Sequence, residues 1–277
     1  MAARAAERDA GPRITVADLP LPCFPPMPDA GLLRDPEIPV GLLNRLAEAR
    51  GLVTGGGRPL RFVDAAGAGG AGYEQRAFLH GEVETRPANR HDACNAIAWL
   101  AMPRTKAVIN RRHAQAILAA EAAGRPKRGV LRDALTQLDE CGVLVCHADP
   151  PLWELVRRHR WREAFHDRRA GVLSAMRFLV LGHASLEALE RPFRGLCGKA
   201  VAIEVSPDWM GRSPQAQWDD ADARLAAWLA GAALRPADLQ PLPFLGIPGL
   251  TPDSEHGDYY DDIGQFRPPR RPAEPVA

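Results

Sequence analysis

Hydrophobic and polar positions follow two different periods along the middle of the chain. Apolar residues three and four positions apart predict helices over Val40–Arg50, Arg90–Ala101, Pro103–Ala123 and Gln217–Ala230. Apolar runs predict strands over Leu60–Val63, Met176–Leu181 and Lys199–Val205. Further helices are expected over Pro151–Arg158, Arg160–Arg168 and Gly182–Glu190, and Tyr73–Leu79 fits either type. This irregular order predicts an α+β fold rather than a regular doubly wound sheet.

One pair of apolar runs resembles a hairpin. Leu135–Leu138 and Val143–Cys146 flank four residues that begin with Asp139 and Glu140 and end in glycine. Adjacent carboxylates in a turn are ordinarily solvated. They would matter for chemistry only if the hairpin tip pointed at His91 or His183.

Proline is concentrated at the two ends of the chain. Residues 1–40 hold eight of the 26 prolines and residues 236–277 hold nine. We therefore expect an extended, partly disordered segment over 1–35, one α+β core domain over 36–235, and a proline-rich strap with a loose tail over 236–277. The Gly-Ala run from Ala65 to Gly72 is expected to be a flexible loop, and it lacks the spacing of a phosphate-binding motif.

Charge and cysteine content narrow the function classes. The chain of 277 residues has 35 Lys plus Arg and 34 Asp plus Glu, a formal charge of +1, which argues against a nucleic-acid binder that relies on bulk charge but leaves a local basic groove open. Its five cysteines show no CxxC spacing, so we expect reduced thiols in the cytoplasm. No signal-like or membrane-spanning apolar run is present, so no membrane partner is expected.

The helix that begins near His91 has an unusual polar stripe. His91, Asp92, Asn95 and Trp99 fall within an arc of about 100°, and no Lys, Glu or Arg occurs between Ala93 and Pro103. Such residues are typical of a half-buried pocket wall. The structural alternative is a capped helix start, with Asn89 as the N-cap and Asp92 at the third position, where a carboxylate favours the helix dipole.

The next helix places Lys106, Asn110 and His113 on one stripe, with Arg104 in its first turn. Arginine and lysine suit an anionic substrate. The alternative is a solvated basic face, which we favour for His113.

A third candidate follows an apolar strand directly. His183 and Glu187 are four residues apart on the helix that begins at Gly182. A histidine and a carboxylate on one face can bind a divalent metal or act as a base and its orienting partner. The alternative is a helix ion pair worth only tenths of a kcal/mol.

Several of these residues also lie in segments that resemble the proteobacterial family of domains of unknown function 3025 (DUF3025). The resemblance is carried by Gly81–Ala96, Trp99–Lys106, Asn110, Leu138–Val143, Gly182, His183, Glu187, Pro192–Leu196, Gly246–Gly249, Tyr260–Asp262 and Phe266–Pro268. It covers about Tyr73 to Pro268. The chain departs from the pattern at Arg90 and Cys94, where aromatic residues are expected, and at Met102, where phenylalanine is expected. The family implies no activity.

The leading hypothesis is a hydrolase that uses a metal or a His/carboxylate pair on a small anionic substrate; a divalent metal is the cofactor considered. In it Asp92, His183 and Glu187 are metal ligands or acid–base groups, and His91 is a second ligand or general base. Asn95 orients the substrate. The anionic group is held by Arg86, Arg104, Lys106 and Asn110.

Two alternatives remain open. The first is a non-catalytic binding or assembly protein whose polar clusters are buried hydrogen-bond networks. The second is nucleic-acid processing, which rests on Arg104, Lys106, Arg111, Arg112 and the basic run Arg157–Arg162.

Overall fold

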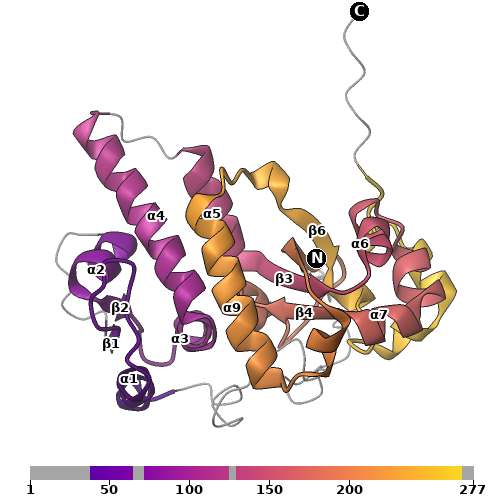
Figure 1. The fold of residues 1–277 in the computed structure, drawn as a ribbon, viewed down its shortest axis with the longest axis horizontal. Helices are drawn as coiled ribbons and strands as arrows, with labels where there is room; N and C mark the ends of the chain where they lie inside the picture. The colour runs from indigo at the N-terminus through magenta and orange to yellow at the C-terminus, as the bar shows by residue number, and fades with distance from the viewer. Residues whose placement is uncertain (1–37, 65–71, 125–128, 270–277) are drawn as a thin grey trace, which may run out of the picture.

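A computed structural model of the chain describes residues 38–64, 72–124 and 129–269 (Figure 1). The expected extended segment over 1–35, residues 65–71 of the Gly-Ala run and the last residues of the expected tail lie outside the described residues.

The centre of the molecule is a four-stranded mixed sheet. Its order is β4 (Met176–Val180), β3 (Gly142–His147), β5 (Cys197–Glu204) and β6 (Gln240–Pro243). Strand β5 is parallel to β3, whereas β4 and β6 are each antiparallel to their neighbours. Because successive strand residues point to opposite faces, β3 contributes to two cores. Val143 and Val145 enter one hydrophobic cluster, and Leu144 and Cys146 enter the other.

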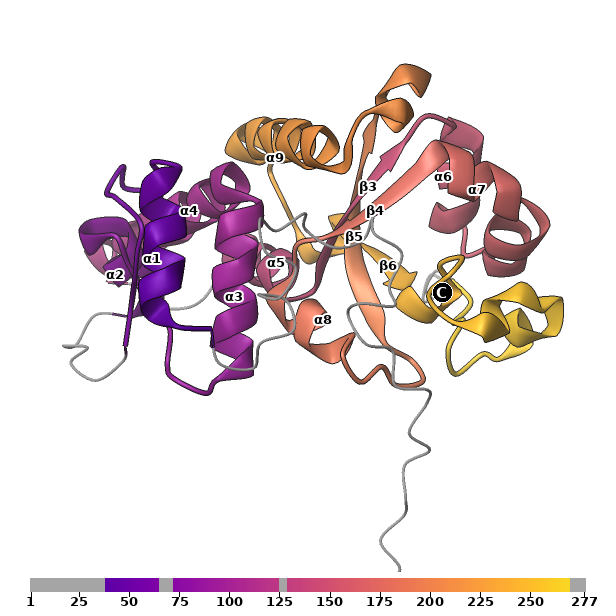
Figure 2. The ribbon, with the colours of Figure 1, turned by 90° about the horizontal axis from the view of Figure 1, so that it is seen from below.

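Helices cover both faces of this sheet. The face of Leu144 packs against α4 (Pro103–Ala122), α5 (Val130–Cys141) and α9 (Pro214–Gly231). The other face packs against α6 (Pro150–Arg157), α7 (Arg169–Ala175) and α8 (His183–Ala188). Figure 2 shows α9 and α8 on opposite sides of the strands. The sheet is therefore enclosed, as its nearly continuous apolar strands require.

The N-terminal part of the described chain forms a helical group beside this sheet (Figure 2). It consists of α1 (Val40–Ala49), α2 (Tyr73–His80) and α3 (Arg90–Ala101), with a parallel pair of short strands, β1 (Arg61–Val63) and β2 (Glu82–Glu84). Helix α3 packs against α8, and α4 packs against α9, which joins the group to the sheet.

Short turns complete the chain. A π-helical turn covers Glu163–Asp167, and 3₁₀ turns cover Pro207–Gly211, Pro236–Asp238, Phe244–Gly246, Pro252–Glu255 and Gly257–Asp261. The C-terminal part, expected to be extended or looping, thus also contains strand β6. Phe244, Ile247 and Leu250 from this part are buried in the core.

The fold class is confirmed, and the expected helices and strands are found within three residues of their expected bounds; the ambiguous segment after Gly72 is helix α2. The predicted hairpin is wrong. Residues 130–141 form one helix, α5, which runs without a loop into β3. The apolar residues Leu131, Leu135 and Leu138 are three and four positions apart and face the core, so the helical period decides the structure. Asp139 and Glu140 consequently lie on the last turn of a helix.

Two glycines make the junctions around β3 unusually close. The backbone N–H groups of Leu181 and Gly182 both donate to the carbonyl of Gly142, at 3.1 and 2.9 Å. A Cβ atom on Gly182 would lie 2.3 Å from the Gly142 nitrogen, and one on Gly142 would lie 2.1 Å from the Leu138 carbonyl oxygen. Only glycine permits this approach. As a result, the C-terminal end of α5 meets the N-terminal end of α8.

Candidate functional site

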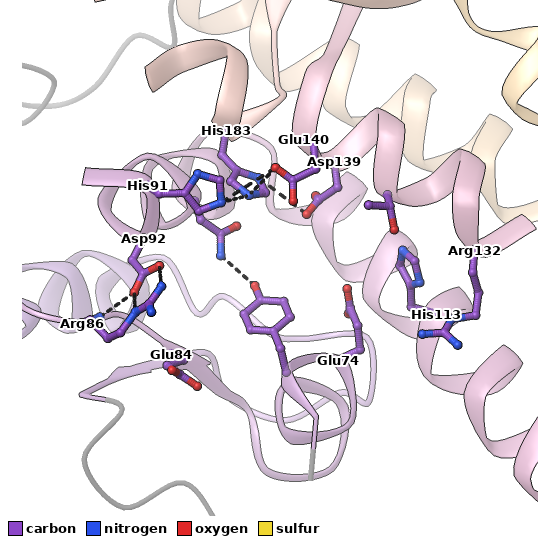
Figure 3. A pocket seen from close by; sticks show the side chains of 13 residues that line it. Glu74, Glu84, Arg86, His91, Asp92, His113, Arg132, Asp139, Glu140 and His183 are labelled. Atoms are coloured by element: carbon purple, nitrogen blue, oxygen red, sulfur yellow. Dashed lines mark hydrogen bonds and ion pairs between the residues drawn. The ribbon is translucent and has the colours of Figure 1, made fainter. Parts of the chain in front are cut away.

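A pocket of about 380 Å³ lies where helices α2, α3, α4 and α5 meet the start of α8 (Figure 3). Its wall includes His91 and Asp92 from α3, Asp139 and Glu140 from α5, and His183 from α8. The two polar groups on α3 and α8 that the sequence singles out therefore open onto one cavity.

Three donor atoms converge at one end of this pocket. Nε2 of His183 lies 3.1 Å from Nε2 of His91 and 3.4 Å from Oε2 of Glu140. The His91 Nε2 to Glu140 Oε2 distance is 3.8 Å. These separations resemble the edges of a tetrahedral zinc site, since bonds of about 2.0–2.1 Å place neighbouring donors about 3.3–3.4 Å apart. Among the described residues, this is a group that could hold a metal ion.

A carboxylate lies behind each of the two histidines, on the side away from the cluster. Nδ1 of His91 lies 2.9 Å from a Glu187 carboxylate oxygen, which can only accept, so the ring hydrogen is on Nδ1. In that tautomer Nε2 of His91 presents a lone pair to the cluster. Nδ1 of His183 faces the Asp139 carboxylate at 3.7 Å, although no hydrogen bond is formed there. A carboxylate behind each imidazole is the usual outer arrangement of metal-binding histidines.

Electrostatics keep His183 in the form that binds metals. The ring is 5% exposed, and this burial lowers the pKa of His183 to about 4. The ring is therefore neutral at pH 7. Glu140 is more open, with a side chain 38% exposed, and partial burial raises its pKa. His91 is similarly open, with its side chain 39% exposed. One side of the cluster thus faces solvent in the pocket.

A buried ion pair supports Asp139. Nζ of Lys106 donates to Asp139 at 2.5 Å and to Oδ1 of Asn95 at 2.8 Å, and it lies 5.5 Å from the centre of the Trp99 ring. Burial alone would raise the pKa of Asp139, but the charge and the hydrogen bond of Lys106 lower it. Asn95 also donates to the hydroxyl of Tyr73 at 2.9 Å. Lys106 and Asn95 therefore use their polar atoms to brace the pocket wall.

Asp92 is directed away from the three converging donors (Figure 3). Its carboxylate accepts from the backbone N–H of Arg86 at 2.9 Å and from the guanidinium at 2.7 and 2.9 Å. Burial would raise the pKa of Asp92, but these bonds and the charge of Arg86 lower it. The backbone N–H of Asp92 is capped by Asn89 at 3.0 Å, as the sequence predicts. Asp92 and Arg86 thus neutralise each other at the pocket edge.

A carboxyl from α2 lies inside the pocket. Oε2 of Glu74 accepts from Nδ2 of Asn110 at 2.8 Å. Burial and the charge of Asp139 raise the pKa of Glu74 to about 7. Nδ2 of Asn110 also donates to the backbone carbonyl of Glu74, and Oδ1 of Asn110 accepts from the backbone N–H of Gly55. His113, expected on a solvated face, is 3% exposed and lines the pocket, because α5 and α2 cover that stripe of α4.

Arg104 lies elsewhere. It lines a second hollow of about 460 Å³ with Arg50 and Arg111. The backbone N–H groups of Arg104 and Thr105 donate to the Asp222 carboxylate at 3.0 and 2.8 Å. Of the four residues expected to hold an anion, only Arg86 is in the wall of the first pocket, while Lys106 and Asn110 lie behind it.

Comparison with known families shows to which family the chain belongs. The sequence matches the family described as "Protein of unknown function (DUF3025)" over residues 60–270. The chain belongs to the DUF3025 family. No curated protein and no solved structure matched this DUF3025 chain. Among the described residues, no helix combines the length and the apolar character needed to cross a bilayer.

Sequence reasoning missed three groups at the site of this DUF3025 protein. Glu140 was placed on a hairpin tip, although the helical spacing of the leucines before it was the signal that could have placed it. Tyr73 and Glu74 follow a Gly-rich run and carried no motif. Arg132 and Thr136, four positions apart on α5, also line the pocket, and no motif in the sequence marks them.

Proposed function

We propose that this protein is a metal-dependent hydrolase whose divalent ion is bound by His91, Glu140 and His183. The observation that carries the proposal is the convergence of three electron-pair donors within 3.1–3.8 Å of one another. A cation bound between the two Nε2 atoms would replace the hydrogen bond that the rings otherwise share. A set of two histidines and one carboxylate with an open side is the ligand pattern of catalytic zinc sites.

This ligand set differs from the one that the sequence suggests. Glu187 supports the proposal as an orienting group on His91, and Asp139 as the carboxylate behind His183. Glu140 takes the carboxylate position for which Asp92 and Glu187 were candidates. Asp92 is held by Arg86, and a ligand role would require those hydrogen bonds to break.

The chemistry follows from the open side of the cluster. A bound divalent ion lowers the pKa of its water to about 7, which supplies a nucleophile at neutral pH. His91 and Glu140 line the pocket and leave room for a substrate above that position. Glu74 offers a carboxyl that can hold or release a proton near neutrality. The buried Lys106–Asp139 pair keeps the support behind His183 fixed.

Metal binding is the direct test. Calorimetric titration of EDTA-treated protein with zinc should give one site per chain. His183→Ala, His91→Ala and Glu140→Gln should each weaken it by more than about 100-fold, because even outer partners of metal ligands contribute about 10–100-fold. The exposed residues His256 and Glu48 provide matched controls, and His256→Ala and Glu48→Gln should bind as the wild type does. Zinc binding that survives all three ligand substitutions would refute the site.

Turnover is the second test. The zinc and manganese forms should hydrolyse p-nitrophenyl acetate, and His183→Ala should not, while His256→Ala should retain the activity. If zinc binds at the site and p-nitrophenyl acetate is not hydrolysed, the hydrolase part of the proposal fails and only the metal site stands.

A second candidate is a non-catalytic protein in which the polar clusters hold the core together. The observation in its favour is the buried network of Lys106, Asp139 and Asn95, with exposed fractions of 2%, 8% and 7%. Under this candidate His183→Ala should destabilise the fold by several kcal/mol without any metal effect.

A further inference from the structure

The pocket extends away from the three metal-ligand candidates along two antiparallel helices. Lys106 of α4 is paired with Asp139 of α5 at one end, and His113 of α4 and Arg132 of α5 line the other end. Figure 3 shows Arg132 and His113 together, on the far side of Glu74 from His91. Arg132 and Glu140 are eight residues apart on α5, which corresponds to about 12 Å of helix. A ligand long enough to use both ends is therefore larger than a single ion.

Arg132 differs from the other cations around this pocket. Arg86 is matched by Asp92, and Lys106 by Asp139. The Nε atom of Arg132 is buried and has no hydrogen-bond partner within the described chain. Arg132 interacts electrostatically with the carboxyl group of Glu74, but that carboxyl accepts its hydrogen bond from Asn110. A buried donor of a charged group without an acceptor is costly, so the site favours a ligand that supplies one.

The charge of the surroundings selects the kind of anion. Glu74, Asp139 and Glu140 all line the pocket, so a doubly charged group would be repelled. One guanidinium matches one carboxylate, and the pair can form two parallel hydrogen bonds. We propose that the ligand of this pocket carries a carboxylate that binds Arg132, at the end opposite to His91, Glu140 and His183. This inference rests on the proposed function for the position of the reacting group, but the Arg132 contact does not require a metal.

The substrate class follows from the two ends together. It is a small carboxylic acid whose hydrolysable bond lies several atoms from the carboxylate, so that the bond reaches the metal-ligand cluster while Arg132 holds the acid. Thr136, between Arg132 and Glu140 on the same face of α5, lines the path between them.

Two probes separate this inference from the proposed function. Hexanoate binding to EDTA-treated protein, measured by calorimetry at low salt, tests Arg132 alone. Arg132→Gln should weaken it by about tenfold or more, since hydrogen bonds to charged groups contribute at about this level. Arg132→Lys should be intermediate because lysine keeps the charge but not the two-pronged geometry. Arg111→Gln is the matched control: Arg111 is an exposed arginine of the second hollow, and its variant should bind as the wild type does.

Adipate has the same length as hexanoate and a second carboxylate. On the zinc form it should bind at least tenfold more tightly than hexanoate, and Arg132→Gln should lose most of that binding. If zinc does not increase the affinity for adipate while hexanoate binding still depends on Arg132, the proposed function fails and this inference stands. Hexanoate binding that is absent, or equal in wild type and Arg132→Gln, overturns the inference. Displacement of hexanoate by inorganic phosphate at lower concentration than by acetate overturns the choice of a carboxylate.

Discussion

The Lys106–Asp139 pair gives the sharpest prediction for stability. Their side chains are 3% and 11% exposed, and the ion pair is 2.5 Å long. Lys106→Met removes the partner but leaves the Asp139 charge in a buried position. Breaking a buried pair from one side costs about 3–5 kcal/mol. Lys106→Met should therefore lower the free energy of unfolding by about that amount.

The assay is urea unfolding at pH 7, with the midpoint and the m-value both measured. Lys199→Met is the matched control, because Lys199 lies half-buried on β5, and it should change stability by less than about 1 kcal/mol. The double variant Lys106→Met/Asp139→Leu should recover much of the loss, since it leaves no unpaired charge. A single variant that loses less than about 1 kcal/mol, or a double variant no better than the single, would refute the reasoning.

The same variant has a defined pH dependence. Lys106 lowers the pKa of Asp139 in the folded wild type, so the contribution of Asp139 is present above the unfolded pKa of about 4 and is lost as pH falls below it. Without Lys106, burial favours protonated Asp139. The stability difference between wild type and Lys106→Met should therefore shrink between pH 7 and pH 4.

Other substitutions test the site more locally. Gly182→Ala should weaken zinc binding by at least about tenfold, because its Cβ would lie 2.3 Å from the Gly142 nitrogen; Gly211→Ala, where a Cβ has open space, should not, and calorimetry compares them. Asp92→Asn should cost about 1 kcal/mol of stability yet leave zinc affinity unchanged; a lost zinc site would restore the sequence-based ligand choice. The pKa of Glu74 is raised from 4.5 to about 7, so wild-type stability should fall as pH rises through that range, and Glu74→Gln should flatten the urea midpoint against pH.

The sequence predicted much of the fold because its strongest patterns are local. Helix α3 matches its expected bounds of Arg90 and Ala101, and its polar stripe does face a pocket. The hairpin error arose at Gly142, where a helix joins a strand without a loop. A glycine after two acidic residues normally indicates a turn, but here it permits close contact with Gly182.

The composition of the site could be anticipated only in part. The sequence indicates His91 by the polar stripe of its helix and His183 by its position directly after an apolar strand. Their contact, across a sequence separation of 92 residues, depends on how α3 packs on α8, and no spacing rule predicts that. Glu187 was seen as the partner of His183, whereas the fold turns it toward His91. The packing of the helices therefore determines that Glu187 contacts His91 and that Glu140 contacts His183.

The separation of the donors along the chain also bears on the order of folding. Glu140 and His183 are anchored beside neighbouring strands, so they become adjacent once β3 and β4 pair. His91 joins them only when α3 packs against α8, which is a separate contact from the pairing of β3 with β4. The three-donor cluster is thus complete only when the helical group has docked on the sheet. A chain caught before that stage would hold two donors without the third, so high-affinity zinc uptake during refolding would report the docking of α3 on α8.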